Sequence, residues 1–588
     1  MALRRGVALI VTLIVLACLL SISGLALVYL VTTREPVVAT RSTLVLRLSG
    51  DLTEGGPEDG VTGWLPGARH PTVRNIVENL RKAKEDPRVT GVLLMPSGLQ
   101  APYWAKLQEI RDALIDFRKS GKSATAYLEY GGAQEYLLAT GCDRVFLVPS
   151  SPLDLTGLAM YELFLRGTLD KIGAYPDMYH IGEYKTATNQ LTEKGFTPAH
   201  REMDESLNSD LYTQLVMAIA EARKKTPAEV RAILDQGPFL PEDALRAGLI
   251  DDVAYEDQVE EKLKAEDRAT RRIDLDDYSR VSAASFGLGV GPRIAVLYVD
   301  GTIVSGRSGY DPMSGAVVGS QTLIDSIRKI RNDATIRAIV LRINSPGGSS
   351  VASDVIWREL VITRDRRRDT PMVVSMSDLA ASGGYYIAAA APTIVAEPGT
   401  LTGSIGILGG KIVIGGTLGK LGITNDAVSN GRNAQMESPF KVFTEEERAK
   451  FQEQLQAFYD QFVEKVAETR RMKPERVDTL GLGRVWTGQQ AKQLGLVDEI
   501  GGLDRAIAIA KQAAKIPATS GVEIVMYPPQ RSLYDFLWGQ LGSDSREALY
   551  LAALAGAVHV RSLGMLAAPL VLFRPGEPLA LMPPVGTR

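Results

Sequence analysis

The sequence predicts an α/β protein built from two copies of one βα unit, and three observations support this fold class. Short, unbroken apolar runs such as 294–299 and 339–343 alternate with segments of helical periodicity such as 73–80 and 323–330. Apolar strands that alternate with helices are typical of a mostly parallel sheet whose two faces are covered. Several stretches of sequence also recur further along the chain.

The recurring stretches keep the same order and almost the same separation. The pairs, with the first-copy member first, are 91–98 with 338–345, 143–149 with 392–398, 155–157 with 401–403, and 247–251 with 494–498. Several matches with the same order and an almost constant separation indicate a duplicated unit rather than chance. At 588 residues, the chain is also too long for a single hydrophobic core.

These observations divide the chain into five parts. We expect an anchor (1–34), a first copy (41–267), a linker rich in charge and then in Ser and Gly (268–291), a second copy (292–517) and a tail (518–588). Within the second copy, the Gly- and Ser-rich stretch 301–319 is predicted to be a loop. The tail contains two apolar segments, 548–560 and 562–573, each too short to cross a bilayer. Buried packing, a subunit contact and attachment to a membrane surface all remain open for it.

The N-terminal segment predicts a transmembrane helix. Residues 7–31 carry no charged side chain. As a helix they would extend about 37 Å, more than a hydrocarbon core of about 30 Å. A cleaved signal peptide would have a shorter apolar run followed by a cleavage site. Because Arg4 and Arg5 precede the run, we expect a single-pass, uncleaved anchor with the rest of the chain outside the cytoplasm.

Composition excludes several classes of function. The net charge of −3 gives no basic field for a nucleic-acid backbone. The two cysteines, Cys18 and Cys142, exclude a disulfide framework and any all-cysteine metal site. We therefore expect no nucleic-acid partner, no metal and no cofactor.

Two glycine-containing motifs in the second copy could support nucleophilic catalysis. Residues 344–348 (NSPGG) follow a predicted strand, and residues 381–386 (ASGGYY) open an Ala-rich helix. A serine at the start of a helix, here Ser382, lies near free backbone N–H groups. A Gly-Gly turn lets such groups approach a reacting carbonyl, as an oxyanion hole requires. Taken singly, each motif could equally be packing glycines beside an ordinary N-cap serine.

Together with 402–406 (TGSIG), these motifs resemble the signal peptide peptidase A family in its long, two-copy form with an N-terminal anchor. The resemblance covers about 45–515. It implies tandem domains of the Clp protease and crotonase type of fold. It also implies a membrane-anchored serine endopeptidase that degrades cleaved signal peptides and other apolar peptides. The expected setting is the bacterial inner membrane, with the domains on the periplasmic side. The expected assembly is a closed, ring-like homo-oligomer, a tetramer.

The resemblance also implies roles for individual residues. Ser382 would be the nucleophile, and Lys185, in 182–187 (GEYKTA), would be the general base of a serine–lysine dyad. The backbone N–H groups of Gly348 and Gly383 would form the oxyanion hole. Ser404 is a candidate for orienting the lysine ammonium, with an ordinary turn serine as the alternative.

The residues favour a lysine base independently of the resemblance. Of the four histidines, His70, His180, His200 and His559, none lies between Ser382 and the end of the second copy. A serine–histidine pair therefore cannot be built within that copy. His180 and His200, which flank Lys185 in the sequence, remain alternative bases.

Each copy has kept half of one site. The first-copy position that matches Ser382 falls near Ala133, where there is no serine, and the second-copy match to Lys185 falls at Arg432 or Asn433. We therefore expect a site assembled across the two copies, within a chain or between chains. A lysine acts as a base only when neutral, and lowering its pKa by about three units costs roughly 4 kcal/mol, which burial at an interface can impose.

Two other functions fit the same fold. A crotonase-like acyl-coenzyme A enzyme would need a nucleotide site, for which the sequence has no basic signature, and it would not explain Lys185. A catalytically inactive membrane scaffold would predict decay of the nucleophile loop, yet Ser382 and its flanking glycines are present.

Overall fold

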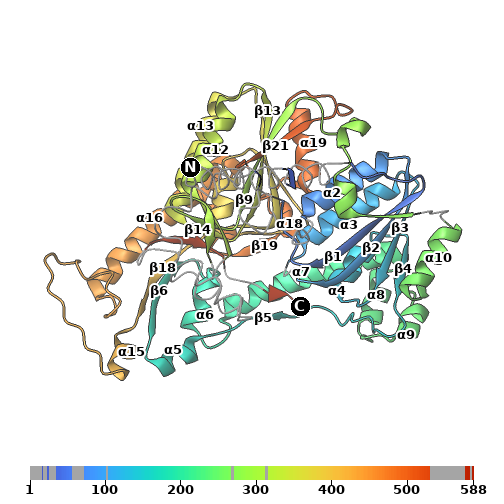
Figure 1. The fold of residues 1–588 in the computed structure, drawn as a ribbon. Coiled ribbons are helices and arrows are strands. Elements are labelled where there is room, and N and C mark those ends of the chain that lie inside the picture. The colour runs from blue at the N-terminus through green and yellow to red at the C-terminus, as the bar shows by residue number, and fades with distance from the viewer. Residues whose placement is uncertain are drawn as a thin grey trace, which may run out of the picture.

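The computed structural model describes residues 16, 23–24, 35–55, 72–100, 103–266, 271–311, 315–529, 577–582 and 586–587. These residues form two similar α/β units and a third sheet that both units share (Figure 1). Within these ranges, no helix combines the length and apolar character that a bilayer crossing needs. The predicted anchor, apart from three residues, and the two apolar segments of the tail lie outside the described residues.

The first unit contains six parallel strands in the order β7-β4-β3-β2-β1-β8. Their bounds are β1 (Ser42–Gly50), β2 (Val89–Leu99), β3 (Ser123–Leu128), β4 (Arg144–Leu147), β7 (Asp252–Val253) and β8 (Arg271–Asp274). The helices of this half are α2 (Val73–Glu85), α3 (Ala105–Arg118), α4 (Ala133–Ala139), α5 (Arg166–Ile172), α6 (Asn189–Thr192), α7 (Pro198–Arg223), α8 (Pro227–Leu234), α9 (Pro241–Arg246), α10 (Glu256–Glu266) and α11 (Leu275–Ser279). Helix α2 shows why the sequence folds this way: Thr72 caps its N-terminus, Lys82 and Lys84 lie in its last turn, and one apolar face packs into the core.

The second unit repeats the first strand for strand. Its parallel strands pair in the order β20-β16-β15-β13-β9-β21. Their bounds are β9 (Arg293–Asp300), β13 (Ile336–Ser345), β15 (Met372–Ala381), β16 (Thr393–Ala396), β20 (Glu499–Ile500) and β21 (Glu523–Tyr527). The helices are α12 (Ser320–Asn332), α13 (Ser350–Arg366), α14 (Gly383–Ala388), α15 (Gly415–Lys420), α16 (Glu445–Arg470), α17 (Pro474–Leu480), α18 (Gly488–Gln493) and α19 (Leu503–Ala513). The shared order confirms the predicted duplication.

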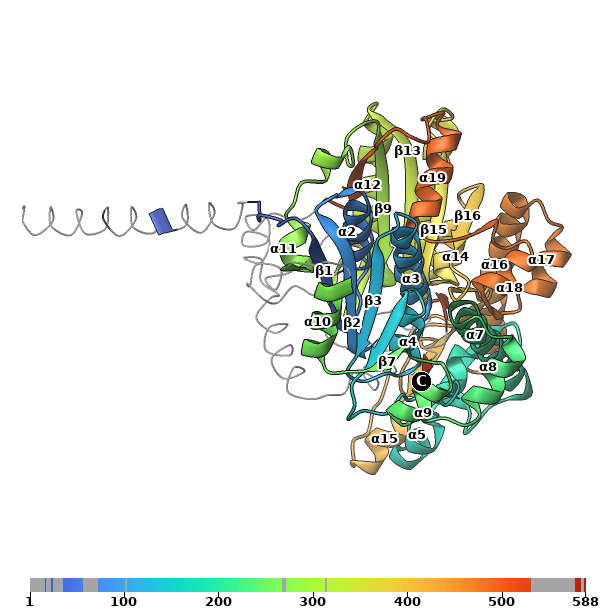
Figure 2. The ribbon, with the colours of Figure 1, turned by 90° about the vertical axis from the view of Figure 1, so that its right-hand side faces the viewer.

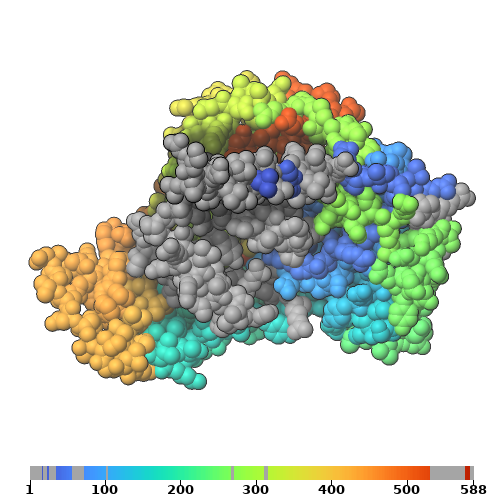
Figure 3. All heavy atoms as spheres, in the orientation of Figure 1, coloured from blue at the N-terminus to red at the C-terminus, as the bar shows by residue number. Residues whose placement is uncertain are grey.

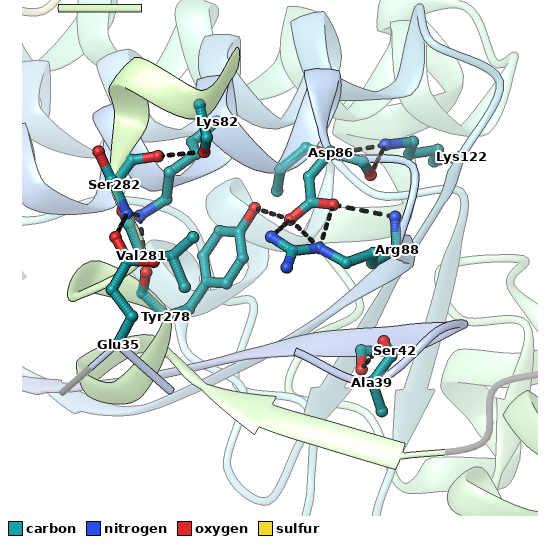
Figure 4. A network of polar contacts seen from close by, with 12 residues as sticks. Glu35, Ala39, Ser42, Lys82, Asp86, Arg88, Lys122, Tyr278, Val281 and Ser282 are labelled. Atoms are coloured by element: carbon teal, nitrogen blue, oxygen red, sulfur yellow. Dashed lines mark hydrogen bonds and ion pairs between the residues drawn. The ribbon is translucent and has the colours of Figure 1, made fainter. Parts of the chain in front are cut away.

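Strands β8 and β21 extend each copy beyond the expected boundaries, because β8 lies in the predicted linker and β21 in the predicted tail. Polar contacts hold the chain after β8 against α2 (Figure 4). The Lys82 Nζ atom donates to the carbonyl oxygens of Tyr278 (2.6 Å) and Val281 (2.9 Å). The Tyr278 hydroxyl donates to Asp86 at 3.2 Å. Residues 271–281 are therefore part of the first unit.

Helix α3 of the first unit lies against β15 of the second unit, and α2 lies beside α3 (Figure 2). Buried ion pairs join the two units there. Arg342, on β13, donates to Glu54 (2.6 Å) and to Glu109 on α3 (2.6 Å). Lys106, also on α3, pairs with Asp378 on β15 at 3.3 Å. Because an unpaired buried charge is very costly, this network fixes how the two units meet.

The third sheet has the order β11-β12-β10-β14-β22-β18-β6. The bounds of its strands are β6 (Tyr175–Ile181), β10 (Thr302–Val304), β11 (Gly309–Asp311), β12 (Gly315–Gly319), β14 (Gly347–Ser349), β18 (Ile407–Val413) and β22 (Leu579–Leu581). The prediction of a loop over 301–319 is wrong, since β10, β11 and β12 all lie there. The sheet joins strands from the first copy, the second copy and the tail.

Residues 415–442 stand out from the body beside α5 (Figures 1 and 3). We call them the arm. The arm begins at α15, where Lys420 donates a hydrogen bond to the carbonyl oxygen of Lys171, and residues 421–434 are almost all exposed. Several of its exposed side chains are large and apolar: Leu421, Ile423, Val428, Phe440 and Val442. The arm thus presents apolar surface away from both cores.

Candidate active site

Ser382 and Ser404 are brought together by two neighbouring strands. Strand β17 (Leu401–Gly403) pairs in parallel with the end of β15, so that Ala381 is aligned with Gly403. Ser382 and Ser404 are the next residues on the two strands. The Ser382 N–H also donates to the Gly403 carbonyl oxygen at 2.8 Å. Residues that leave the same edge of a parallel sheet are thereby held side by side.

The backbone at Ser382 adopts a conformation that L-residues rarely take. Its φ is 54° and its ψ is −114°. Such a conformation is strained for a residue with a Cβ atom, and it turns the chain sharply into α14. Glycine fits at the next position without displacing its neighbours, whereas a Cβ atom on Gly383 would lie 2.6 Å from Ser353 Oγ and 3.2 Å from the Ala580 carbonyl oxygen. Local backbone strain at a single serine is a feature of functional sites.

Lys185, which follows β6, reaches both serines. Its Nζ atom lies 2.7 Å from Ser382 Oγ, 2.9 Å from Ser404 Oγ and 3.0 Å from the Ser404 carbonyl oxygen. All three residues are fully buried. The structure therefore brings together one residue of the first copy and two of the second, all three of which were singled out in the sequence.

The surroundings of Lys185 favour its neutral form. None of the groups that its Nζ atom contacts among the described residues is a carboxylate. Burial therefore lowers the pKa of Lys185 well below its ordinary value, without a counter-charge to restore it. A neutral amine can accept a proton from a hydroxyl at hydrogen-bond distance.

Glycines of the second copy leave room for the Lys185 backbone. A Cβ atom on Gly483 would lie 2.4 Å from the Lys185 nitrogen, and one on Gly406 would lie 3.1 Å from Lys185 Cδ. The neighbouring Tyr184 N–H donates to the Leu482 carbonyl oxygen at 2.9 Å. Gly483 was not among the site residues predicted from the sequence. Its only local signal was the Gly-Leu-Gly run at 481–483.

The two predicted oxyanion-hole glycines lie on neighbouring elements. Gly348 is in β14, with a φ of 151°, and a Cβ atom there would lie 2.1 Å from the Ile303 carbonyl oxygen. A Cβ atom on the preceding Gly347 would lie 2.7 Å from the Gly383 nitrogen. The backbone of β14 therefore runs past the Gly383 N–H with no side chain between them.

Strand β22, from the predicted tail, lies beside β14. The two strands are antiparallel, with Gly348 aligned with Ala580. A Cβ atom on Gly347 would lie 2.0 Å from the Ala580 carbonyl oxygen, and one on Gly383 would lie 3.2 Å from it. The described tail thus passes next to Ser382. The sequence alone left the role of this segment open and gave no sign of its position beside Ser382.

Neither histidine that could replace Lys185 bonds to Ser382. The His180 Nδ1 atom contacts the Gly182 carbonyl oxygen at 2.8 Å. His200 is buried, and its Nε2 atom lies 3.3 Å from Glu162 Oε2 and 3.7 Å from Asp204 Oδ2. Among the described residues, one group has the composition and spacing to hold a metal ion: Glu162, His200 and Asp204. Their ligand atoms lie within 4.8 Å of one another.

The described residues of the first copy do not form a second site of the same kind. The helix that corresponds to α14 is α4, and its N-cap is Gly132, which has no hydroxyl. Arg432, a predicted counterpart of Lys185, is exposed on the arm, 3.8 Å from Glu446. Within the described part of the chain, the two copies together form one such constellation.

A serine on a strained turn, a buried amine on its hydroxyl and unobstructed N–H groups beside it are typical of serine-type hydrolases. The chain belongs to a family of such enzymes. The model of "Peptidase family S49" matches residues 116–270 and 364–517, once in each copy. The chain is therefore a serine-type peptidase, as the sequence motifs predicted.

Of three known relatives, two match most of the chain and the third matches part of it. "Serine protease SPPA, chloroplastic" of Arabidopsis thaliana is 37% identical over 480 residues, which are 80% of this chain and 70% of the relative. "Protease 4" of Salmonella typhi is 33% identical over 511 residues, 84% of this chain and 79% of the relative. "Putative signal peptide peptidase SppA" of Enterococcus faecium is 34% identical over 232 residues, 39% of this chain and 66% of the relative. These matches confirm the predicted family.

Proposed function

We propose that this peptidase is a membrane-anchored endopeptidase that cuts apolar peptides with a serine–lysine dyad, Ser382 as nucleophile and Lys185 as general base. The observation that carries the proposal is the 2.7 Å contact between Lys185 Nζ and Ser382 Oγ. A buried lysine without a carboxylate partner serves no evident stabilising purpose, since burial penalises its charged form. Such an arrangement is better explained by proton transfer.

In the first half of the reaction, Lys185 accepts the Ser382 hydroxyl proton while Ser382 Oγ attacks the substrate carbonyl carbon. The negative charge that develops on the carbonyl oxygen is stabilised by the N–H groups of Gly348 and Gly383. The protonated Lys185 then gives its proton to the leaving amine, which leaves an acyl-enzyme. Water attacks this ester with Lys185 again as the base, and Ser382 recovers its proton.

Ser404 holds Lys185 in place during these transfers. Its hydroxyl and its carbonyl oxygen both lie within hydrogen-bond distance of Lys185 Nζ. The two N–H groups of the neutral amine can donate to these two acceptors. Its lone pair is then directed toward the Ser382 hydroxyl. Ser404 therefore acts as a positioning residue.

We propose that the substrates are apolar peptides, cleaved signal peptides among them. Strand β22 fills the space between β14 and β18, and we call this space the groove. The groove supports this substrate class, because the residues around β22 are apolar, among them Leu408, Met178 and Val304. A peptide bound there would pair with strand edges through its backbone and be selected by its side chains. The Enterococcus faecium relative carries the name of a signal peptide peptidase.

Residues 7–31 would anchor the enzyme in the bacterial inner membrane, with the catalytic part on the periplasmic side, because of Arg4 and Arg5. We also propose a closed homo-oligomer, a tetramer. The exposed apolar side chains of the arm support this assembly, since a projecting apolar surface is typical of a subunit contact. No cofactor or metal takes part in the proposed mechanism.

Labelling with a serine-reactive fluorophosphonate tests the proposed function. The probe should modify Ser382 in the wild-type protein, and the same protein should cleave an apolar peptide. Ser326→Ala, which removes a buried serine on α12, serves as the matched control and should behave as wild type. A protein that is folded but neither labelled nor active would favour the scaffold alternative.

A further inference from the structure

The segment Pro578–Met582 lies where a peptide substrate would have to bind. We propose that this segment is a built-in pseudosubstrate, which fills the groove and must be displaced before a peptide can be cut. The inference rests on the proposed function, because it assigns an occupant to the same groove. Its support comes from the backbone register, the side-chain contacts and the anchoring of the segment.

The backbone register places one carbonyl group of the segment at the proposed oxyanion hole. The Met582 N–H donates to the Pro346 carbonyl oxygen at 2.8 Å, and the Ser350 N–H donates to the Pro578 carbonyl oxygen at 3.3 Å. In an antiparallel ladder, hydrogen-bonded pairs alternate with pairs that are not bonded. Ala580, two residues from each end, therefore faces Gly348 as a bonded pair.

The position of the Ala580 carbonyl oxygen agrees with this register. A Cβ atom built on Gly347 would lie 2.0 Å from this oxygen. The same Cβ atom would lie 2.7 Å from the Gly383 nitrogen. The oxygen is thus close to both β14 and the Gly383 N–H. In substrate terms, Ala580 takes the place of the residue before the cut bond, and Leu581 that of the residue after it.

The side chains of the segment occupy apolar surroundings. Leu579 packs with Leu408 of β18, and Met582 packs with Met203 and Leu207 of α7. Ala580 is completely buried. The groove is therefore filled by a sequence of the proposed substrate class, with a small residue where the chemistry would take place.

Polar contacts anchor the segment at its N-terminal side. The Ser350 hydroxyl donates to the Pro578 carbonyl oxygen at 2.7 Å, and the Ser349 hydroxyl donates to the Glu577 carboxylate. Beyond the segment, β23 (Gly586–Thr587) pairs with β5 (Met160–Tyr161). The described tail is therefore held on both sides of the groove.

While the segment lies in the groove it covers the nucleophile, so a peptide or a serine-reactive probe reaches Ser382 only when the segment is displaced. Ser382 has no exposed surface in this arrangement. A tethered segment competes at an effective concentration of about millimolar, which would weaken the apparent affinity of a free peptide. Removing the segment from the groove should therefore improve peptide binding.

Binding of a fluorescent peptide to an inactive enzyme tests the proposal without relying on catalysis. The probe is fluorescein-labelled Pro-Leu-Ala-Leu-Met-amide, and its anisotropy is measured with the full chain carrying Ser382→Ala. Adding Leu579→Asp puts a charge into an apolar pocket, which should expel the segment. We expect the apparent Kd of the probe to fall at least tenfold.

A matched control and a second variant complete the binding experiment. Leu240→Asp adds the same charge at an exposed leucine of the first copy and should leave the Kd unchanged. Replacement of residues 577–582 by six Gly and Ser residues should reproduce the gain without adding charge. An unchanged or weaker affinity in both segment variants would show that the segment is a structural wall of the groove.

Activity separates this proposal from the proposed function. With Ser382 intact, Leu579→Asp should lower KM for an apolar peptide and leave kcat within a few-fold. If no variant cleaves any peptide, the proposed function fails while the binding result still decides the role of the segment. If wild type and Leu579→Asp cleave with the same KM, the pseudosubstrate is ruled out.

Discussion

The Nζ atom of Lys185 lies 2.7 Å from the Oγ atom of Ser382, although 197 residues separate them in the chain. One belongs to the first copy and the other to the second. Each copy alone therefore lacks half of the constellation. The duplication makes this possible, because it places the end of β6 beside the end of β15 within one chain.

The pH dependence of the reaction should report the buried lysine. A general base works in its neutral form, and burial lowers the pKa of Lys185 well below its ordinary value. We therefore expect kcat/KM to rise with pH through an apparent pKa below that of a free lysine, and to reach a plateau above it. Stopped assays across the pH range measure this. If kcat/KM rises only near the ordinary pKa of lysine, Lys185 is not the general base.

Loss of the Ser404 hydroxyl should slow catalysis more than it weakens binding. Ser404→Ala leaves Lys185 with one acceptor fewer, and a lost hydrogen bond of this kind corresponds to about a 10- to 100-fold fall in kcat. KM should change little. Ser404→Gly is the control, since Ser404 has a φ of 49° that glycine adopts without strain. Recovery of activity in Ser404→Gly would mean that backbone strain, and not the hydroxyl, was responsible.

Gly483→Ala should disturb Lys185 although it lies in the other copy. The new Cβ atom would fall 2.4 Å from the Lys185 nitrogen, at a φ of 81°. The positive φ alone costs about 1–2 kcal/mol. We expect a lower thermal midpoint and at least a tenfold loss of kcat. Gly195→Ala, with no atom within 4 Å of the new methyl group, should change neither.

Arg342→Met should weaken the contact between the two copies. It leaves the buried carboxylates of Glu54 and Glu109 without their shared guanidinium partner. Breaking a buried pair in this way costs about 3–5 kcal/mol. The midpoint of urea unfolding should fall accordingly. Arg337→Met removes an exposed arginine from the same strand and should have little effect.

Local sequence patterns predicted the α/β fold class and the duplication, which the structure confirms, and they singled out candidate site residues. Apolar runs and helical periodicity predict strands and helices because both depend on neighbouring residues. The residues around Ser382 and Lys185 form short motifs that resemble those of a known family, and it was this resemblance that implied their roles. Ser404 was a candidate for the lysine partner because it lies in the motif 402–406, with a turn serine as the alternative.

Contacts between distant segments could not be read from these patterns. Gly483 leaves room for Lys185 only once the two copies have packed, and the Gly-Leu-Gly run around it does not reveal that role. Arg342 interrupts an apolar strand, but its carboxylate partners come from the other copy. The strands β10, β11 and β12 form in a Gly- and Ser-rich stretch because neighbouring strands supply their hydrogen bonds. Tertiary pairing there overrides local propensity.

The most direct test of the account is the kcat/KM of four variants on one apolar peptide. Ser382→Ala and Lys185→Ala should each lose about a thousandfold or more, and the double variant should be little worse than either, since residues that act as a unit are not additive. Lys185→Arg should also fail, because a guanidinium stays protonated.

Two histidine variants complete the measurement. His180→Ala and His200→Ala should stay within a few-fold of wild type, because neither histidine bonds to Ser382. Near-normal turnover in Lys185→Ala together with an inactive histidine variant would contradict the serine–lysine assignment.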